Sequence, residues 1–335
     1  MASLATAQVV LVLTLSVLFP VGMFFIGPMV LGIAHIAADA RYLVLRQRLP
    51  KAFVVLSAIS AIAIVGLRVL QAQGVVHASI DLWEAAVGAL WLISALAFAA
   101  RDRRARRRAL AVGAGLGGLF VVGLMHASAA NVVMMHAHNV IGIATWVFLY
   151  RKRKAWELLP IAVLTLGVVF ILSGAALPWT YRAGGELAFG THITAIGKWL
   201  APGLTPHVAA GVVISFVLLQ AIHYAVWTTW IPQEDLTGEG TLTFRMTVRG
   251  LIADFGFAGC ALVGAVILGL AGLALFRIHD ALSWYVTLSR FHGLLELAVI
   301  AFLFVRGEDL SRSAAPPMAQ PIAKRFECER RRPAR

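Results

Sequence analysis

The sequence predicts an all-α, polytopic integral membrane protein: a helix bundle with about nine transmembrane spans, its N-terminus outside and its C-terminus inside. Two observations predict this class. The 335 residues are 60% hydrophobic and only 13% charged, and their mean hydropathy is +0.84, whereas soluble domains are about half apolar and a quarter charged. Apolar runs of about 20 residues, the length that crosses a bilayer as a helix, also recur along the chain.

We expect the first span to be long and kinked at Pro20, Gly27 and Pro28, because proline removes a backbone donor and clashes with the preceding turn. Such a break is tolerated where neighbouring helices or a cavity satisfy the backbone, so this segment is expected in the bundle interior. Residues 1–310 form one transmembrane domain, and the Pro-rich, basic residues 311–335 form a disordered tail. The expected spans are about 8–40, 52–73, 82–100, 109–127, 131–150, 156–177, 207–231, 250–275 and 282–305.

The net charge of +13 comes from basic residues in short links between the apolar runs. The links and tail on one side of the predicted bundle hold 24 of the 29 Lys and Arg residues, which is the positive-inside pattern. The charge therefore indicates topology and contact with anionic lipid, not nucleic-acid binding. We expect a multi-pass protein of a bacterial-type inner membrane.

Five histidines lie within predicted spans, where ionisable residues are rare unless they pair, bind a ligand or line a water-filled cavity. His126 lies at the end of a span and is ambiguous. The others are expected to be interfacial polar residues: His77, His192, His207 and His279. The five within spans are His35, His136, His138, His223 and His292.

Two of these histidines precede a carboxylate by four residues, His35 before Asp39 and His292 before Glu296. Side chains at i and i+4 share one helix face, so each pair can present a joint surface to the bundle centre. The carboxylate can be a second metal ligand, or it can hydrogen-bond a ligating imidazole and orient it. A buried polar contact between helices is the other interpretation.

In MMHAHN, His136 and His138 are two residues apart and point roughly 200° apart on a helix, so one of them can face a central site. In LLQAIHYAVWTTW, the tryptophans that follow His223 are interpreted as an interfacial aromatic belt. Arg290 is too far along the chain to pair with Glu296 on one face, and we expect it to neutralise a carboxylate on another helix.

Imidazole and carboxylate ligands in an apolar cavity suit iron, zinc or copper, and non-haem iron is usual where positions must stay open for oxygen. A site within the membrane also meets lipid-soluble substrates directly. These features favour a metal-dependent membrane oxygenase, with Fe²⁺ as cofactor and an apolar substrate such as a carotenoid, sterol or acyl chain. The chain contains no nucleophile elbow, phosphate loop, CxxC or HExxH motif.

The stretches GPMVLGIAHIAADARYL, HAH, LQAIHYAVW and RFHGLLELAVIAFLF resemble, in layout, the Brp/Blh family of membrane carotenoid dioxygenases. The resemblance implies a helical membrane enzyme whose histidine-bound iron cleaves β-carotene to retinal. His35 matches the first-helix ligand, Asp39 its acidic companion, His136 or His138 the mid-chain ligand and His223 a later one. The family's GxPHG is here GIAHI, and Trp227 stands where the family has a further histidine. His292 could supply the ligand that is missing at Trp227, but a histidine ligand at that place is not a feature of the family.

Two other classes remain open. MMHAHNVIGIATW resembles a stretch of haem–copper oxidase-related membrane proteins, with Gly142 at the matching place, so His136 and His292 could ligate a b-type haem in an electron carrier. A proton-coupled transporter could use the same residues as a relay. The preferred metal ligands are His35, His136, His223 and His292, with His138 and His126 in reserve. Asp39 and Glu296 are predicted to act as ligands or to orient them.

Overall fold

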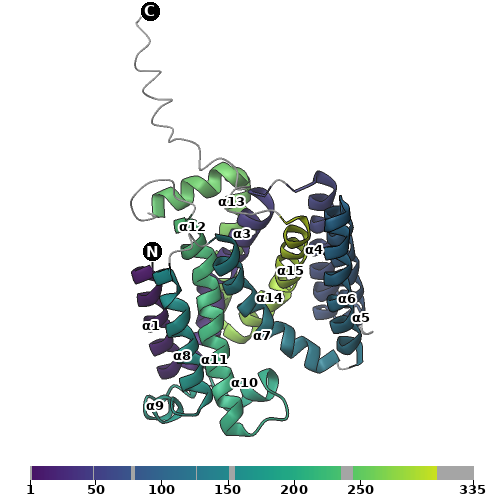
Figure 1. The fold of residues 1–335 in the computed structure, drawn as a ribbon. Helices are drawn as coiled ribbons and strands as arrows, with labels where there is room; N and C mark the ends of the chain where they lie inside the picture. The colour runs from purple at the N-terminus through teal and green to yellow at the C-terminus, as the bar shows by residue number, and fades with distance from the viewer. Residues whose placement is uncertain are drawn as a thin grey trace, which may run out of the picture.

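The computed structural model describes residues 2–47, 49–76, 80–125, 127–150, 155–234 and 244–307, and these residues are almost all helical (Figure 1). The predicted tail at 311–335 and His126 lie outside the described residues, as does His77. Among the described residues, six helices are long and apolar enough to cross a membrane: Pro20–Leu45, Lys51–Ala72, Ile80–Ala99, Pro206–Glu234, Thr247–Phe276 and Ile278–Arg306. The protein is therefore a multi-pass, all-α membrane bundle, as predicted.

Shorter apolar helices complete the bundle, at Ala2–Leu18, Val132–Phe148 and Leu159–Leu172. In chain order the helices are α1 (Ala2–Leu18), α2 (Pro20–Gly27), α3 (Ile33–Asp39), α4 (Lys51–Ala72), α5 (Ile80–Ala99), α6 (Arg103–Met125), α7 (Ala127–Thr145), α8 (Leu159–Leu172), α9 (Leu177–Arg182), α10 (Ile193–Leu200), α11 (Pro206–Ala225), α12 (Ile231–Glu234), α13 (Phe244–Phe276), α14 (Ile278–Ser289) and α15 (His292–Arg306). A 3₁₀ turn, η4 (Ala155–Leu158), precedes α8.

The first predicted span is wrong in one respect: residues 8–40 are not one kinked crossing. The chain breaks at Phe19 (φ −136°, ψ 50°), ahead of Pro20, and α1 and α2 run in opposite directions (Figure 1). The Thr180 hydroxyl of α9 donates to the Val17 carbonyl at 2.7 Å and so holds this break at one end of the bundle. The two ends of the segment 2–45 therefore lie at the other end of the bundle, which contradicts an N-terminus opposite the basic links.

Helix α11 lies at the centre of the bundle and contacts α1, α7, α8 and α10. Its side chains are buried on nearly all sides, which is why the segment reads as apolar throughout instead of amphipathic. A second group of helices, α4, α5 and α6, packs beside this centre, with α15 between α5 and α7. Side chains carried by α3, α7, α11 and α15 can therefore meet in the interior.

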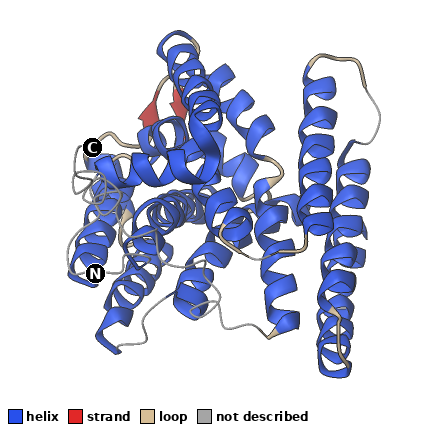
Figure 2. Cartoon of the chain, turned by 90° about the horizontal axis from the view of Figure 1, so that it is seen from above, coloured by secondary structure: helices blue, strands red, loops and turns tan. Residues whose placement is uncertain are grey.

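The segment between the predicted spans at 156–177 and 207–231 contains α9, α10 and a small antiparallel hairpin, β1 (Leu187–Ala188) with β2 (Thr191–His192), the one strand pair among the described residues (Figure 2). Its two-residue turn, Phe189–Gly190, has φ of 51° and 73°, the positive values that tight hairpin turns require.

Helix breaks and caps follow local chemistry. Helix α13 contains a sharp break at Gly256 (φ 72°, ψ 168°), a conformation that glycine adopts without strain. Helix α6 begins after Asp102, whose carboxylate accepts a hydrogen bond from the Ala105 N–H at 2.8 Å. This bond favours the charged carboxylate and holds the pKa of Asp102 below its ordinary value.

Candidate metal centre

Four helical segments bring the intramembrane histidines and carboxylates together. Helix α3 carries His35 and Asp39, α7 carries His138, α11 carries His223, and α15 carries both His292 and Glu296. Both i, i+4 pairs face the bundle centre, and all six side chains are buried except that of His138, which is partly exposed. These six residues are called the histidine–carboxylate cluster below.

The four imidazole rings of the cluster form a closed arrangement. The centroid of the His35 ring lies 5.2 Å from that of His223 and 4.9 Å from that of His292. On the opposite side, the His138 ring lies 4.8 Å from His223 and 4.9 Å from His292. Neighbouring rings therefore meet edge to face around a common centre, so that nitrogens from three helices besides α3 converge there.

The two carboxylates close this centre. One ligand atom from each of His35, Asp39, His223 and His292 lies within 4.8 Å of the other three. Glu296 adds an oxygen, since its Oε1 atom lies 3.5 Å from Nε2 of His223. Imidazole nitrogens and carboxylate oxygens at this mutual spacing could hold a transition-metal ion.

Most polar atoms of the cluster have no hydrogen-bond partner among the described residues. This holds for both ring nitrogens of His35 and His223 and for both carboxylate oxygens of Asp39 and Glu296. Burying a polar group without a partner costs a few kcal/mol, and an unpaired charge costs far more. Eight such atoms in one cluster are a combination that ordinary packing avoids. A cation at the centre would satisfy one nitrogen of each ring and the carboxylate oxygens that face it.

The tautomers of two histidines are set by backbone carbonyls. Nδ1 of His138 lies 3.0 Å from the Met135 carbonyl oxygen, and Nδ1 of His292 is hydrogen-bonded to the Ser289 carbonyl. A carbonyl only accepts, so each Nδ1 carries the proton and each neutral ring directs a lone pair outward from Nε2. Backbone carbonyls orient metal-bound imidazoles in the same way.

Those two Nε2 atoms lie only 3.2 Å apart. Two lone pairs at this distance repel unless a cation or a shared proton lies between them. For metal–nitrogen bonds of about 2.1 Å, two ligands on one ion are about 3.0 Å apart at 90° and about 3.4 Å apart at the tetrahedral angle. The observed spacing therefore fits two ligands of a single ion.

The structure separates the two histidines of MMHAHN, and it selects the one that sequence reasoning held in reserve. His136 points away from the cluster: its Nε2 lies 3.2 Å from the Leu200 carbonyl oxygen, and its ring packs against Phe216. His138 shares a face with Gly142, and a Cβ at Gly142 would lie 2.3 Å from Nδ1 of His223. Because only a glycine lets α11 approach so closely, this face of α7 turns inward and carries His138 with it.

Residues outside the predicted set support the cluster. The Tyr224 ring lies over His35 with centroids 4.3 Å apart, and its hydroxyl is 3.0 Å from that of Tyr285. Gln220 donates to the Tyr224 hydroxyl at 2.8 Å. Gly32 makes room for Tyr285, since a Cβ there would lie 2.2 Å from the ring. The i, i+4 spacing of Gln220 and Tyr224 was visible in the sequence, but the contact with Tyr285 was not.

Three of the four cluster helices continue into π-helical turns. These are η1 (Pro28–Gly32) and η2 (Ala40–Leu45) on either side of α3, η3 (Trp146–Tyr150) after α7, and η5 (Val226–Trp230) after α11. π-Helical turns inside α-helices are rare and occur frequently at functional sites. The fourth helix is interrupted at Arg290 and Phe291, ahead of His292, which leaves the Ser289 carbonyl available to that ring.

The predicted aromatic belt is wrong for both of its tryptophans. Trp227 and Trp230 are fully buried, and the indole N–H of Trp230 donates to Gln8 of α1 at 2.6 Å. The expected role of Arg290 is confirmed, because its Nε lies 2.7 Å from Glu84 on α5. The described histidines expected at the interface, His192, His207 and His279, are exposed.

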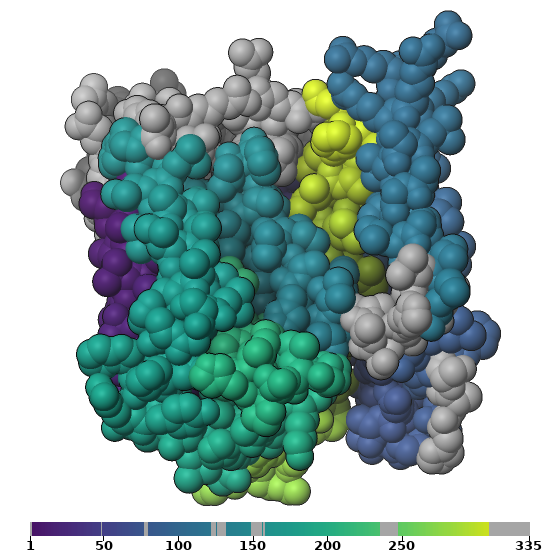
Figure 3. Space-filling model, turned by 60° about the horizontal axis from the view of Figure 1, so that its bottom comes forward, coloured from purple at the N-terminus to yellow at the C-terminus, as the bar shows by residue number. Residues whose placement is uncertain are grey.

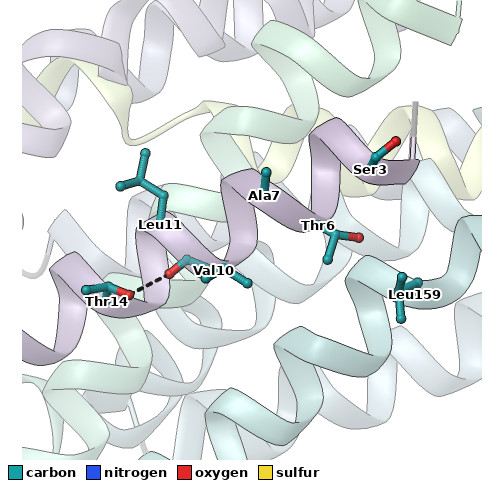
Figure 4. Close-up of a pocket in the computed structure, with 7 residues that line it drawn as sticks. All are labelled: Ser3, Thr6, Ala7, Val10, Leu11, Thr14 and Leu159. Carbon is teal, nitrogen blue, oxygen red and sulfur yellow. Dashed lines mark hydrogen bonds between the residues drawn. The ribbon is translucent and has the colours of Figure 1, made fainter.

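A groove between α1 and α8 has no comparable chemistry (Figure 4). It is lined by Ser3, Thr6, Ala7, Val10, Leu11, Thr14 and Leu159, none of which titrates or binds metals strongly. The Thr14 hydroxyl donates to the Val10 carbonyl of its own helix at 2.9 Å. This surface is an ordinary groove between two apolar helices.

Comparison of the chain with family models, with curated proteins and with solved structures finds no match. The class of protein is therefore defined by its own fold and site. It is a multi-pass membrane helix bundle that encloses a cluster of four histidines and two carboxylates.

Replacing Gly142 with alanine should displace His223 and lower both stability and bound metal. The new Cβ would also lie 3.1 Å from Nε1 of Trp227, and such overpacking costs roughly 1–3 kcal/mol. The measurement is thermal unfolding in detergent together with metal content. Gly66→Ala on α4 is the matched control, since a Cβ there meets no atom within 4 Å. Equal unfolding temperatures and equal metal contents of the two variants would contradict the close approach of α7 and α11.

Proposed function

We propose that this protein is a membrane-embedded non-haem iron oxygenase that acts on a lipid-soluble substrate within the bilayer. The observation that carries the proposal is the pair of outward-directed Nε2 lone pairs on His138 and His292, 3.2 Å apart, beside the unpartnered atoms of Asp39 and His35. Together they form a donor set that a bound cation would stabilise in an apolar interior.

The charge of the donor set supports a divalent ion. Two carboxylates, Asp39 and Glu296, neutralise one doubly charged ion, and the four imidazoles bind as neutral rings. The complex would carry no net charge, which favours its burial in a membrane. Imidazole and carboxylate together suit non-haem iron, which when bound would supply one-electron and oxygen chemistry.

The chain itself contributes positioning and exclusion of water. The carbonyls of Met135 and Ser289 hold two imidazoles in the tautomer that leaves Nε2 free. Tyr224 packs over His35 and restricts its rotation. Adjacent rings with centroids about 5 Å apart surround a space that suits an ion better than the macrocycle of the haem alternative.

Carotenoid cleavage is the activity that the resemblance to the Brp/Blh family favours, so β-carotene is one substrate to assay. We also propose that the basic links face the cytoplasm of a bacterial-type inner membrane. With α1, α6, α7 and α8 crossing besides the six longer helices, the bundle has about ten crossings instead of nine. Both ends of the described chain then lie on the cytoplasmic side.

Metal analysis and a visible spectrum of one detergent-purified sample test the proposal. We expect about one iron per chain without a Soret band, because one ion satisfies the cluster. A Soret band would instead establish the haem-binding class. A protein that contains no metal and takes up none from added Fe²⁺ would overturn the metalloenzyme and favour the proton-relay transporter.

A further inference from the structure

A second feature adjoins the cluster: a cavity of about 730 Å³ among α4, α5, α7, α10 and α14. It lies at the end of the bundle that carries α9 and α10, the end brought forward in Figure 3. Its volume lies within the range of small-molecule sites. Three cations line it, Arg68, Lys198 and Arg290, and part of its wall is apolar, with Val132, Leu282 and Val286.

The positive charge of this cavity is in excess and partly fixed in place. Arg68 donates to Glu84 at 2.6 Å and pairs with Asp81 at 2.7 Å, and Arg290 donates to Glu84 at 2.7 Å. Lys198 forms no ion pair with any described carboxylate, so three cations face two acids and leave a net charge of about +1. Arginines held in this way present preoriented N–H donors to an anion.

Two residues that line the cavity are close to the cluster. Met135 lines the cavity, and its carbonyl accepts the hydrogen bond from His138. Arg290 also lines it and lies two residues ahead of His292. His138 is the one member of the cluster that is partly exposed. A molecule in this cavity would therefore approach the centre from the side of His138 and His292.

Building on the proposed function, we propose that this cavity binds the anionic head of an amphipathic substrate, a single apolar chain that ends in a carboxylate or a phosphate. Lys198 and the arginines bind the head, and the apolar wall directs the chain toward the cluster. An uncharged hydrocarbon such as β-carotene makes no use of these cations. The substrate class is accordingly a fatty-acid-like or lysophospholipid-like anion.

The test is a displacement assay in a neutral detergent, with a fluorescent fatty acid competed by oleate, by oleoyl lysophosphatidate or by oleyl alcohol. Metal content is measured on the same sample. We expect the anions to compete about tenfold better than the alcohol, the effect of one hydrogen bond to a charged group. Stronger competition by oleate identifies a carboxylate head, whereas stronger competition by lysophosphatidate identifies a phosphate head.

Lys198→Gln should weaken binding of the anions by about tenfold without changing metal content, because the side chain is exposed and belongs to no cluster contact. Arg182→Gln is the matched control: it removes an exposed cation at the same end of the bundle, outside the cavity. Equal competition by acid and alcohol, or an equal effect of the two variants, would overturn the anion site. Since metal is measured separately, that result leaves the metalloenzyme proposal standing.

Discussion

Replacing His292 with alanine should lower the metal bound per purified chain by roughly tenfold or more. Its Nε2 lies 3.2 Å from that of His138, and its ring contacts that of His35, so its loss removes a donor from the middle of the set. Loss of even a group that only orients a ligand reduces affinity by about 10–100-fold. The measurement is metal content by mass spectrometry, with size-exclusion chromatography to show that the variant remains folded.

His136 offers the matched control, because it is an intramembrane histidine of the same helix as His138 and lies outside the cluster. His136→Ala should retain the wild-type metal content, whereas His138→Ala should lose metal as His292→Ala does. The opposite result, with metal lost from His136→Ala and kept in His138→Ala, would show that the other face of α7 turns inward. It would also restore the ligand preference derived from sequence.

Replacing Asp254 with alanine should destabilise the protein by roughly 3 kcal/mol. Its Oδ2 atom accepts from Nε of Arg41 at 2.5 Å and from Nε of Arg46 at 3.2 Å, and both arginine side chains are less than 10% exposed. Removing one member of a buried ion pair costs about 3–5 kcal/mol, because the remaining charge stays in the apolar interior. Since Asp254 is partly exposed, we expect the lower value, measured as denaturant unfolding in detergent.

An exposed ion pair provides the comparison. Arg277 and Asp280 form an i, i+3 pair whose side chains are 72% and 42% exposed, and such pairs contribute at most about 1 kcal/mol. Asp280→Ala should therefore unfold close to wild type. Similar losses of stability in the two variants would mean that the contact of η2 with α13 stabilises the protein no more than a surface ion pair does. Other packing would then hold α3 in place.

Part of the candidate site follows from local geometry alone. His35 and Asp39, like His292 and Glu296, lie four residues apart in helical sequence, and that spacing places each pair on one face whatever surrounds it. Their inward orientation could also be predicted, because charged groups avoid lipid. The structure brings both pairs to one centre.

Other parts depended on contacts between distant segments. The tryptophans after His223 were interpreted as an interfacial belt, but the bundle buries Trp227 and Trp230 because α3 and α7 pack against η5 there. The direction of α1 could not be predicted from the positive-inside rule either, since residues 1–40 contain no Lys or Arg. Neither the partners of α11 nor the hairpin of α1 and α2 has a signature in local sequence.

By itself, the sequence determined that this chain is a membrane helix bundle with inward-facing histidine–carboxylate pairs, because hydropathy and helical period are local properties. Only the tertiary structure decided that His138, and not His136, joins His35, His223 and His292. One residue turns a helix by about 100°, and the rotation of α7 is set by the fit of Gly142 against His223, 81 residues away in the chain. A choice between neighbouring positions on a helix is made by such a contact.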